Sequence, residues 1–205
     1  MKDKTKLTAS VYDEISVSYA DKFNEPSDNI DDFLKLIKKG GKILDAGCGP
    51  GVDVAYIISK DFDVIGVDIS ERILEIARKK NPKVHFKKAD IRKLNFKPNT
   101  FDGIIASFSL IHIPKKDIDK TVGNFYKLLK PKGVIYIGIQ EGDSQEVLLA
   151  EPLKPDEKIF LNIMSSKEIK EILNKIGFSI LVEFSRRAES KEEFGFNKFV
   201  VIAKK

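Results

Sequence analysis

The 205-residue sequence has a single cysteine, no apolar run long enough to cross a membrane, and no block of like charges. One thiol excludes an internal disulfide and any zinc site built from several cysteines, which agrees with a reducing compartment. A membrane-spanning helix needs about 20 consecutive apolar residues, and the lysine-rich start leads into no apolar signal core. We therefore expect a cytoplasmic protein that binds no membrane and holds no metal.

The charge of the sequence is dispersed rather than concentrated. The chain has 36 Lys and Arg residues against 31 Asp and Glu residues, a net charge of +5, and the two signs are mixed along its length. A nucleic-acid partner favours a basic stripe with interleaved aromatic residues, whereas this distribution is typical of a solvated surface. Hydrophobic residues make up 42% of the chain, as in ordinary globular proteins, and its length most simply forms one domain.

The most informative stretch is Lys42–Gly51, an apolar strand that ends at Asp45 and is followed by glycines at alternate positions. Gly47, Gly49 and Gly51 predict a tight turn, because residues without a Cβ tolerate positive φ and let a ligand lie against the backbone. The N–H groups of the helix that follows would face such a ligand. A dinucleotide fingerprint has its third glycine one position later, where this sequence has a valine.

Asp45 distinguishes this turn from a pyrophosphate site. A carboxylate repels a pyrophosphate but attracts a ligand that carries ammonium and sulfonium groups, such as S-adenosylmethionine. The stretch from Ile43 to Gly51 resembles motif I of the class I S-adenosylmethionine-dependent methyltransferases, in particular the small single-domain members of type 11/25. The alternatives are a glycine-rich turn without a ligand and a nicotinamide-dependent oxidoreductase, which Asp45 argues against.

Two further acids follow at the ends of the next predicted strands. Asp68 lies about 20 residues after the turn, where an acid can accept both ribose hydroxyls of an adenosine. Ser70 is expected to cap the following helix in its place, and Ile69 to lie flat on the adenine. The resemblance implies that Asp90 accepts the adenine amino group and that Ile91 offers its backbone N–H to the ring; a plain turn acid is the alternative for Asp90.

Acceptor chemistry is expected after the fourth predicted strand, 101–107, because an open α/β sheet binds ligands at the carboxyl ends of its strands. Ser107 is placed there to meet the methionine moiety of the cofactor. His112 is the candidate general base, since a neutral imidazole can take a proton from an incoming nucleophile. The alternative is that His112 fixes the loop by hydrogen bonding, with Glu141 as a second candidate base.

Two segments are expected to cover the site. Tyr12 and Tyr19 lie on an amphipathic helix predicted over 10–23, and the resemblance implies a tyrosine-rich lid that closes over the methionine end of the cofactor. The alternative is a helix that simply packs on the sheet. Residues 140–164 predict a long connection, of the kind that forms lids or binding loops. We therefore expect an N-terminal helical lid over 1–40 and a substrate-covering insertion over 140–164.

The resemblance covers nearly the whole chain from Lys42 onward and implies one methyltransferase domain over residues 1–205. The implied fold is α/β: a Rossmann-like, doubly wound sheet, mostly parallel, with strand order 3-2-1-4-5-7-6. Two strands predicted over 178–184 and 196–203 form a C-terminal hairpin that contributes the one antiparallel strand.

The function that follows is transfer of a methyl group from S-adenosylmethionine to a small-molecule acceptor by in-line displacement. No Asn-Pro-Pro-Tyr-type tetrapeptide follows the fourth strand, which argues against enzymes that methylate the exocyclic amines of bases. The lone Cys48 lies inside the glycine turn, which argues against pyrimidine C5 methylation. An RNA or protein methyltransferase and a non-catalytic S-adenosylmethionine-binding protein stay open as alternatives, and the sequence fixes neither the acceptor nor the oligomeric state.

Overall fold

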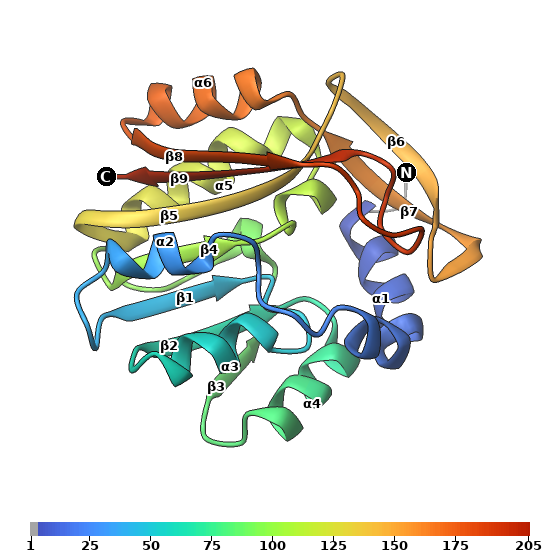
Figure 1. Cartoon of the computed structure of the whole chain (residues 1–205), viewed down its shortest axis with the longest axis horizontal. Helices are drawn as coiled ribbons and strands as arrows, with labels where there is room; N and C mark the ends of the chain where they lie inside the picture. Colours follow the sequence, from blue (N-terminus) through green and yellow to red (C-terminus); the bar gives the residue numbers. More distant parts are fainter. Residues whose placement is uncertain (1–3) are drawn as a thin grey trace.

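A seven-stranded sheet forms the centre of the molecule (Figure 1). The computed structural model describes residues 4–205, so the first three residues of the predicted lid and of the lysine-rich start lie outside the described residues. The strands of the sheet are β1 (Lys42–Ala46), β2 (Asp63–Asp68), β3 (His85–Lys88), β4 (Phe101–Ala106), β5 (Leu129–Glu141), β8 (Ser179–Arg186) and β9 (Asn197–Lys204).

The topology of this sheet is that of a doubly wound fold. Its order is β3-β2-β1-β4-β5-β9-β8, and the pairs among β1 to β5 are all parallel. β9 is antiparallel to both of its neighbours, β5 and β8. With β8 and β9 counted as the sixth and seventh strands, this confirms the predicted order and the C-terminal hairpin.

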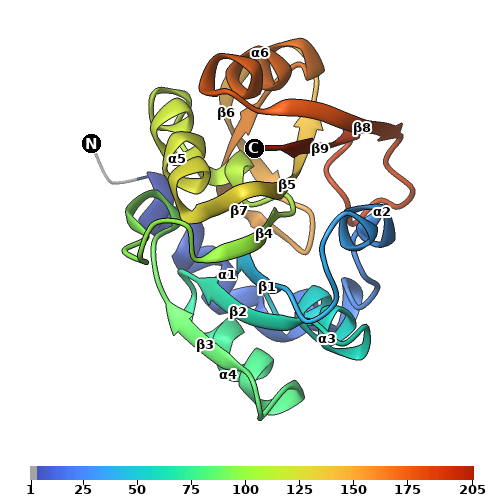
Figure 2. The same cartoon turned by 90° about the vertical axis from the view of Figure 1, so that its left-hand side faces the viewer.

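Helices cover both faces of the sheet (Figure 2). They are α1 (Lys4–Lys22), α2 (Ile30–Lys35), α3 (Val52–Ser59), α4 (Glu71–Lys80), α5 (Lys115–Leu128) and α6 (Ser166–Ile176), with short 3₁₀ turns η1 (Ile91–Lys93) and η2 (Leu110–His112). α2, α3 and α4 pack on one face, and α5 and α6 pack on the other. The strands are apolar on both sides for this reason: in β4, Ile104 joins the core under α5 whereas Ile105 joins the core under α2.

α1 lies at the carboxyl end of the sheet rather than on either face. Its residues Val11 and Ile15 form a small separate core with Ile159. The helix begins six residues earlier than its apolar pattern predicts, because its first turns bury Thr5 and Thr8, which an apolar period does not detect. Among the described residues, no helix is both long and apolar enough to span a membrane.

The segment 140–164 is not the irregular connection that its sequence predicts. β6 (Gln145–Glu151) and β7 (Lys154–Ile163) form a separate two-stranded antiparallel sheet, seen at the upper right of Figure 1. Pro152 and Pro155 suggested a loop, but Pro152 lies in the hairpin turn. Pro155 lies where the register shifts between the pairs Glu151–Lys154 and Ala150–Lys158, so its missing N–H breaks no ladder bond.

Candidate functional site

The glycine turn after β1 forms the floor of the site. Gly47, Gly49 and Gly51 have φ angles of 93°, 50° and 80°, the left-handed conformation that their sequence predicts. A Cβ on Gly47 would lie 2.4 Å from the Cβ of Ser109, so the loop after β4 packs directly on this turn. A Cβ on Gly49 would meet only Cε1 of Tyr19, at 3.8 Å, because open space lies above it.

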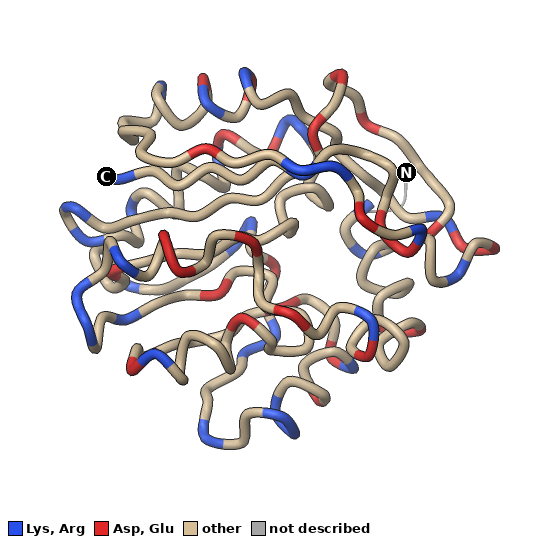
Figure 3. Tube along the Cα trace, in the orientation of Figure 1, with Lys and Arg blue, Asp and Glu red and all other residues tan. Residues whose placement is uncertain are grey.

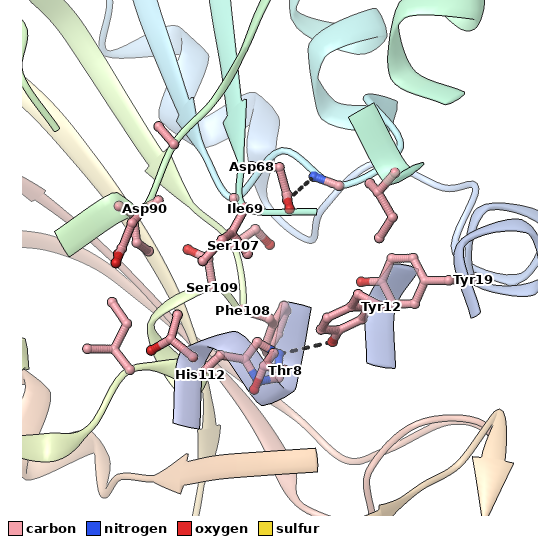
Figure 4. Close-up of a pocket in the computed structure, with 17 residues that line it drawn as sticks. Thr8, Tyr12, Tyr19, Asp68, Ile69, Asp90, Ser107, Phe108, Ser109 and His112 are labelled. Atoms are coloured by element: carbon pink, nitrogen blue, oxygen red, sulfur yellow. Dashed lines mark hydrogen bonds between the residues drawn. The ribbon is translucent and has the colours of Figure 1, made fainter. Parts of the chain in front are cut away.

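A cavity of about 650 Å³ opens above this turn, at the carboxyl ends of β1, β2 and β4 (Figure 4). The predicted site residues that line it are Tyr19, Gly47, Gly49, Asp68, Ile69, Asp90, Ile91, Ser107 and His112, together with the predicted lid residue Tyr12. In Figure 4 the two acids lie on the strand side, opposite the tyrosines of α1. Parallel pairing thus brings residues from separate strands to a single wall.

Asp68 is held in place by backbone N–H groups. Its Oδ2 accepts from the N–H of Gly49 at 3.0 Å, and its Oδ1 accepts from the N–H of Ser70 at 2.9 Å. Burial raises the pKa of Asp68. The backbone N–H of Ile69 also hydrogen-bonds to this carboxylate. A carboxylate has about four acceptor sites, so Asp68 keeps acceptor capacity for a ligand hydroxyl. Ser70 caps α4 as predicted, since its Oγ accepts from the N–H of Ile73 at 3.2 Å.

Asp90, at the far end of the wall, forms an ion pair that the sequence analysis missed. The Nε of Arg92 lies 3.0 Å from both carboxylate oxygens, and its Nη2 donates to Oδ2 at 2.7 Å. The backbone N–H of Arg92 adds a bond of 2.9 Å to Oδ1. The two residues are only two positions apart, but nothing in their spacing distinguishes a pair from two solvated charges. Asp90 therefore keeps fewer free acceptor sites than Asp68.

Asp45 does not line the cavity. It lies beneath the glycine turn with 2% of its surface exposed, and its Oδ2 has no hydrogen-bond partner among the described residues. Burial raises the pKa of Asp45 well above its usual range, and the charges of Asp53 and Asp68 raise it further. The structure thus brings Asp68 and Asp90 together on one wall and separates Asp45 from it.

His112 connects the loop after β4 to α1 and β7. Its Nδ1 lies 3.0 Å from the carbonyl oxygen of Phe160, and its Nε2 lies 3.0 Å from the hydroxyl of Tyr12. A carbonyl only accepts, so Nδ1 carries the proton and Nε2 accepts from Tyr12. Burial lowers the pKa of His112 to about 4, which keeps the ring neutral near pH 7. Glu141, the other candidate base, is not among the residues that line this cavity.

A second cavity of about 580 Å³ adjoins the first, and Tyr12, Tyr19 and Phe108 line both. The rest of its wall consists of Phe23, Ile111, Gln140, Glu151, Arg186, Glu192, Glu193, Phe194 and Lys198. Glu151 comes from the segment expected to cover the substrate. The connection between β8 and β9 was missed, because its mixed charges predict only a solvated loop.

Comparison with known proteins identifies the family. The family model for a methyltransferase domain matches residues 43–133, which include the glycine turn, Asp68 and Asp90. An uncharacterized protein of Methanocaldococcus jannaschii is 30% identical over 211 residues, which cover 95% of this chain and 98% of that protein. The chain belongs to the class I S-adenosylmethionine-dependent methyltransferases.

Two further methyltransferases illustrate the range of this family. Phosphoethanolamine N-methyltransferase 3 of Arabidopsis thaliana is 37% identical over 111 residues, and the match spans 52% of this chain but only 22% of the plant protein. A crystal structure of Burkholderia thailandensis 1,6-didemethyltoxoflavin-N1-methyltransferase, with bound 1,6-didemethyltoxoflavin and S-adenosylhomocysteine, shares the fold with a TM-score of 0.73. It is 19% identical and the alignment covers 98% of this chain and 88% of that one.

S-adenosylmethionine is the cofactor of this methyltransferase family, and the residues of the first cavity fit it. The buried Ser109 hydroxyl, on the cavity wall, has no hydrogen-bond partner among the described residues. A ligand with an ammonium group supplies hydrogen-bond donors for such acceptors. Asp68 offers acceptor sites for hydroxyls, and Ile69 and Ile91 offer apolar area for a flat ring.

Proposed function

We propose that this protein transfers a methyl group from S-adenosylmethionine to a small-molecule acceptor. The observation that carries the proposal is the pair of adjoining cavities, which meet at Tyr12, Tyr19 and Phe108. The cofactor supplies a methyl group on a positively charged sulfur, and that charge vanishes as the methyl group leaves. The chain itself has to align two ligands and exclude water, which is what a site enclosed by α1 and the β6–β7 hairpin does.

The cofactor-binding residues are assigned by their place on the wall. We assign Asp68 to the ribose, Ile69 to the face of the adenine, and Asp90 with the backbone N–H of Ile91 to its polar edge. Tyr19 and the glycine turn, at Gly47 and Gly49, cover the opposite, methionine end. Support comes from the free acceptor sites of Asp68 and from the open space above Gly49.

Ser107 and Asp45 are assigned to the ammonium group of the methionine moiety. The hydroxyl of Ser27 donates to Asp53 at 2.6 Å, so the contact of 2.6 Å between Ser27 and Ser107 has Ser107 as its donor. The lone pairs of Ser107 then remain for a cationic ligand. Asp45 acts from beneath the turn, where its field favours a positive charge in the cavity.

The domain roles follow from which elements enclose the cavities. We assign the lid to α1 rather than to all of residues 1–40, since α2 packs on the sheet with Phe33 and Leu34 fully or almost fully buried. The hairpin β6–β7 is the substrate-covering insertion. Tyr12 and Tyr19, on α1, are the side chains of the lid that line both cavities.

A small acceptor is favoured over RNA by the charge distribution. Figure 3 shows Lys and Arg spread among Asp and Glu over residues 4–205, and this part of the chain forms no basic stripe of the kind that tracks a phosphate backbone. His112 stays the candidate general base, with one condition set by geometry. Its Nε2 accepts from Tyr12, so Tyr12 has to turn away before the imidazole takes a proton from an acceptor.

The experiment that tests the proposal uses isotopically labelled S-adenosylmethionine. The protein is incubated with it and a metabolite extract, and mass spectrometry identifies what acquires label. Label in a small molecule supports the proposal, whereas label only in RNA or protein contradicts it. Calorimetric binding of S-adenosylhomocysteine without any labelled product indicates a non-catalytic binder, and NADH serves as the control for an oxidoreductase.

A further inference from the structure

The second cavity contains a buried carboxylate without a charged partner. Glu151, the last residue of β6, is 3% exposed and lines the cavity. Its Oε1 accepts from the N–H of Leu153 at 3.3 Å, and its Oε2 has no hydrogen-bond partner among the described residues. A buried carboxylate oxygen left without a donor is costly, so this position is one that a ligand with a donor group completes.

The arginine of the same cavity is already neutralised. Arg186 donates from Nε to Asp28 at 2.7 Å and from Nη1 to Glu193 at 3.1 Å. Near the opening, Glu192 pairs with Lys22 at 3.1 Å. These contacts leave neither Arg186 nor Glu192 as an uncompensated charge for a ligand.

Lys198 is the other cation on the cavity wall, and its donors are used as well. It is 4% exposed, and its Nζ donates to Oε1 of Gln140 at 2.7 Å and to the carbonyl oxygen of Phe194 at 2.9 Å. It also lies 3.6 Å from Glu193. For an anionic acceptor, both cations of the cavity, Arg186 and Lys198, are therefore already engaged by groups of the protein. For a cationic acceptor, the cavity offers Oε2 of Glu151, which has no partner among the described residues.

Aromatic rings line the same cavity as this carboxylate. Tyr12 and Tyr19 stand edge to face with centroids 5.1 Å apart, and Phe23 lies 4.7 Å from Tyr19. Burial raises the pKa of both tyrosines, and the charge of Glu151 adds to the effect. Ring faces and a carboxylate are the two kinds of group that bind organic cations.

We propose that the second cavity binds an organic amine as the methyl acceptor and that Glu151 holds its ammonium group; this rests on the proposed methyl transfer. The ammonium first gives one proton to Glu151. The nitrogen lone pair then forms the new N–C bond, the C–S bond breaks, and its electron pair stays on sulfur. The product is a methylated ammonium, and the cofactor becomes an uncharged thioether.

The test uses benzylamine, which is protonated near pH 7 and keeps its N–H donors. S-adenosylhomocysteine has no methyl group to transfer, so in its presence the binding of benzylamine is measured apart from activity. Calorimetry in the presence of S-adenosylhomocysteine is expected to show binding to the wild-type protein. Glu151→Gln, which keeps the shape of the side chain, is expected to weaken it by about tenfold or more. Glu157→Gln is the matched control, since Glu157 lies on the same hairpin, half-exposed and 3.9 Å from Lys154.

The outcomes separate this inference from the proposed function. Binding of S-adenosylhomocysteine with no binding of benzylamine, or with tighter binding of benzoate, overturns the amine acceptor and leaves the methyltransferase proposal standing. An equal loss of benzylamine binding in Glu151→Gln and Glu157→Gln overturns the role of Glu151. No binding of S-adenosylhomocysteine to the wild-type protein overturns the proposed function itself.

Discussion

Three buried acids dominate the electrostatics around the glycine turn. Burial raises the pKa of Asp45, Asp53 and Asp68, and the charges of the other two raise that of Asp45 further. Like charges at short range, away from water, destabilise the ionised form of each. The ionised forms of these carboxylates therefore repel one another, and a cationic ligand stabilises them.

At this scale we expect Asp45→Asn to stabilise the ligand-free protein. The folded pKa of Asp45 lies above the unfolded value of about 4, so between the two the folded state binds more protons. Its contribution to the free energy of unfolding therefore falls as pH rises through that window. Asn removes this contribution, for a gain of about 1–3 kcal/mol at pH 8 and less at pH 5. Urea unfolding of both proteins at the two pH values measures it, and a less stable variant at pH 8 would contradict it.

His112 gives a dependence of opposite sign. Its folded pKa of about 4 lies below the ordinary value of 6.5, so between these values the unfolded state binds more protons and stability rises with pH. We expect the wild-type protein to lose about 2 kcal/mol of His112-linked stability from pH 7 to pH 5. Denaturation of the wild-type protein and of His112→Gln at both pH values isolates the contribution of His112 to the free energy of unfolding. If instead kcat of the wild-type protein changes with pH near 6.5 and this change disappears in the variant, His112 is an accessible base that titrates there.

The residues that sequence reasoning finds are those whose role is fixed by the backbone. Gly47 and Asp68 follow from a turn and a strand end, so local pattern suffices. Arg92 and Glu151 were missed for another reason. Arg92 matters because it pairs with the carboxylate of Asp90, and Glu151 because it shares a cavity with the tyrosines of α1. The apolar periodicity of the sequence indicates neither arrangement.

At the scale of elements, the hairpin β6–β7 is the main difference between expectation and structure. Its strand β7 buries side chains on both sides between residues 159 and 163. On one side Ile159 packs on α1 and Leu161 joins the main core, and on the other side the ring of Phe160 is buried beneath Lys4 of α1. A run of residues buried on both sides shows no alternation of apolar and polar side chains, the pattern that predicts a half-buried strand. The core strands were easier to predict, since βαβ units place them between helices whose apolar faces are regular.

We expect the contact between this hairpin and α1 to control how tightly the lid closes. Ile159→Ala removes a fully buried side chain between Val11 and Ile15, at a cost of about 2–5 kcal/mol to that contact. Hydrogen exchange is then expected to be faster in α1 and S-adenosylhomocysteine binding weaker. Leu148→Ala, at a side chain 52% exposed on β6, is the matched control and should change neither. Unchanged protection of α1 in Ile159→Ala would show that the lid closes without the hairpin.

At the scale of the whole molecule, the sheet order explains why the fold was predictable when the acceptor was not. β1 is parallel to both β2 and β4, so the carboxyl ends of these three strands meet at one edge of the sheet. The first cavity is built at that edge from local motifs. The second cavity, proposed for the acceptor, instead combines α1, the hairpin and the connection before β9, which are brought together only by tertiary packing.

Ligand binding is therefore expected to stabilise the entire domain. S-adenosylhomocysteine at a hundred times its Kd should raise the free energy of unfolding by about 2.7 kcal/mol. Asp68→Asn should remove most of this gain in stability at the same ligand concentration, because the charge-assisted contact between residue 68 and the ligand is lost. Asp63→Asn, at the exposed amino end of the same strand, should keep the full gain. Thermal unfolding with and without the ligand measures this gain in stability for both variants. An equal gain in the two variants would contradict the assignment of Asp68 to the ribose.

Because α1 lines both cavities, we expect the ligands of both cavities to leave by the same route. We expect an outward swing of α1 that frees the spent cofactor to uncover the methylated product as well. Departure of the two products should then follow one common opening rate, which a rapid-mixing experiment with both products labelled would resolve.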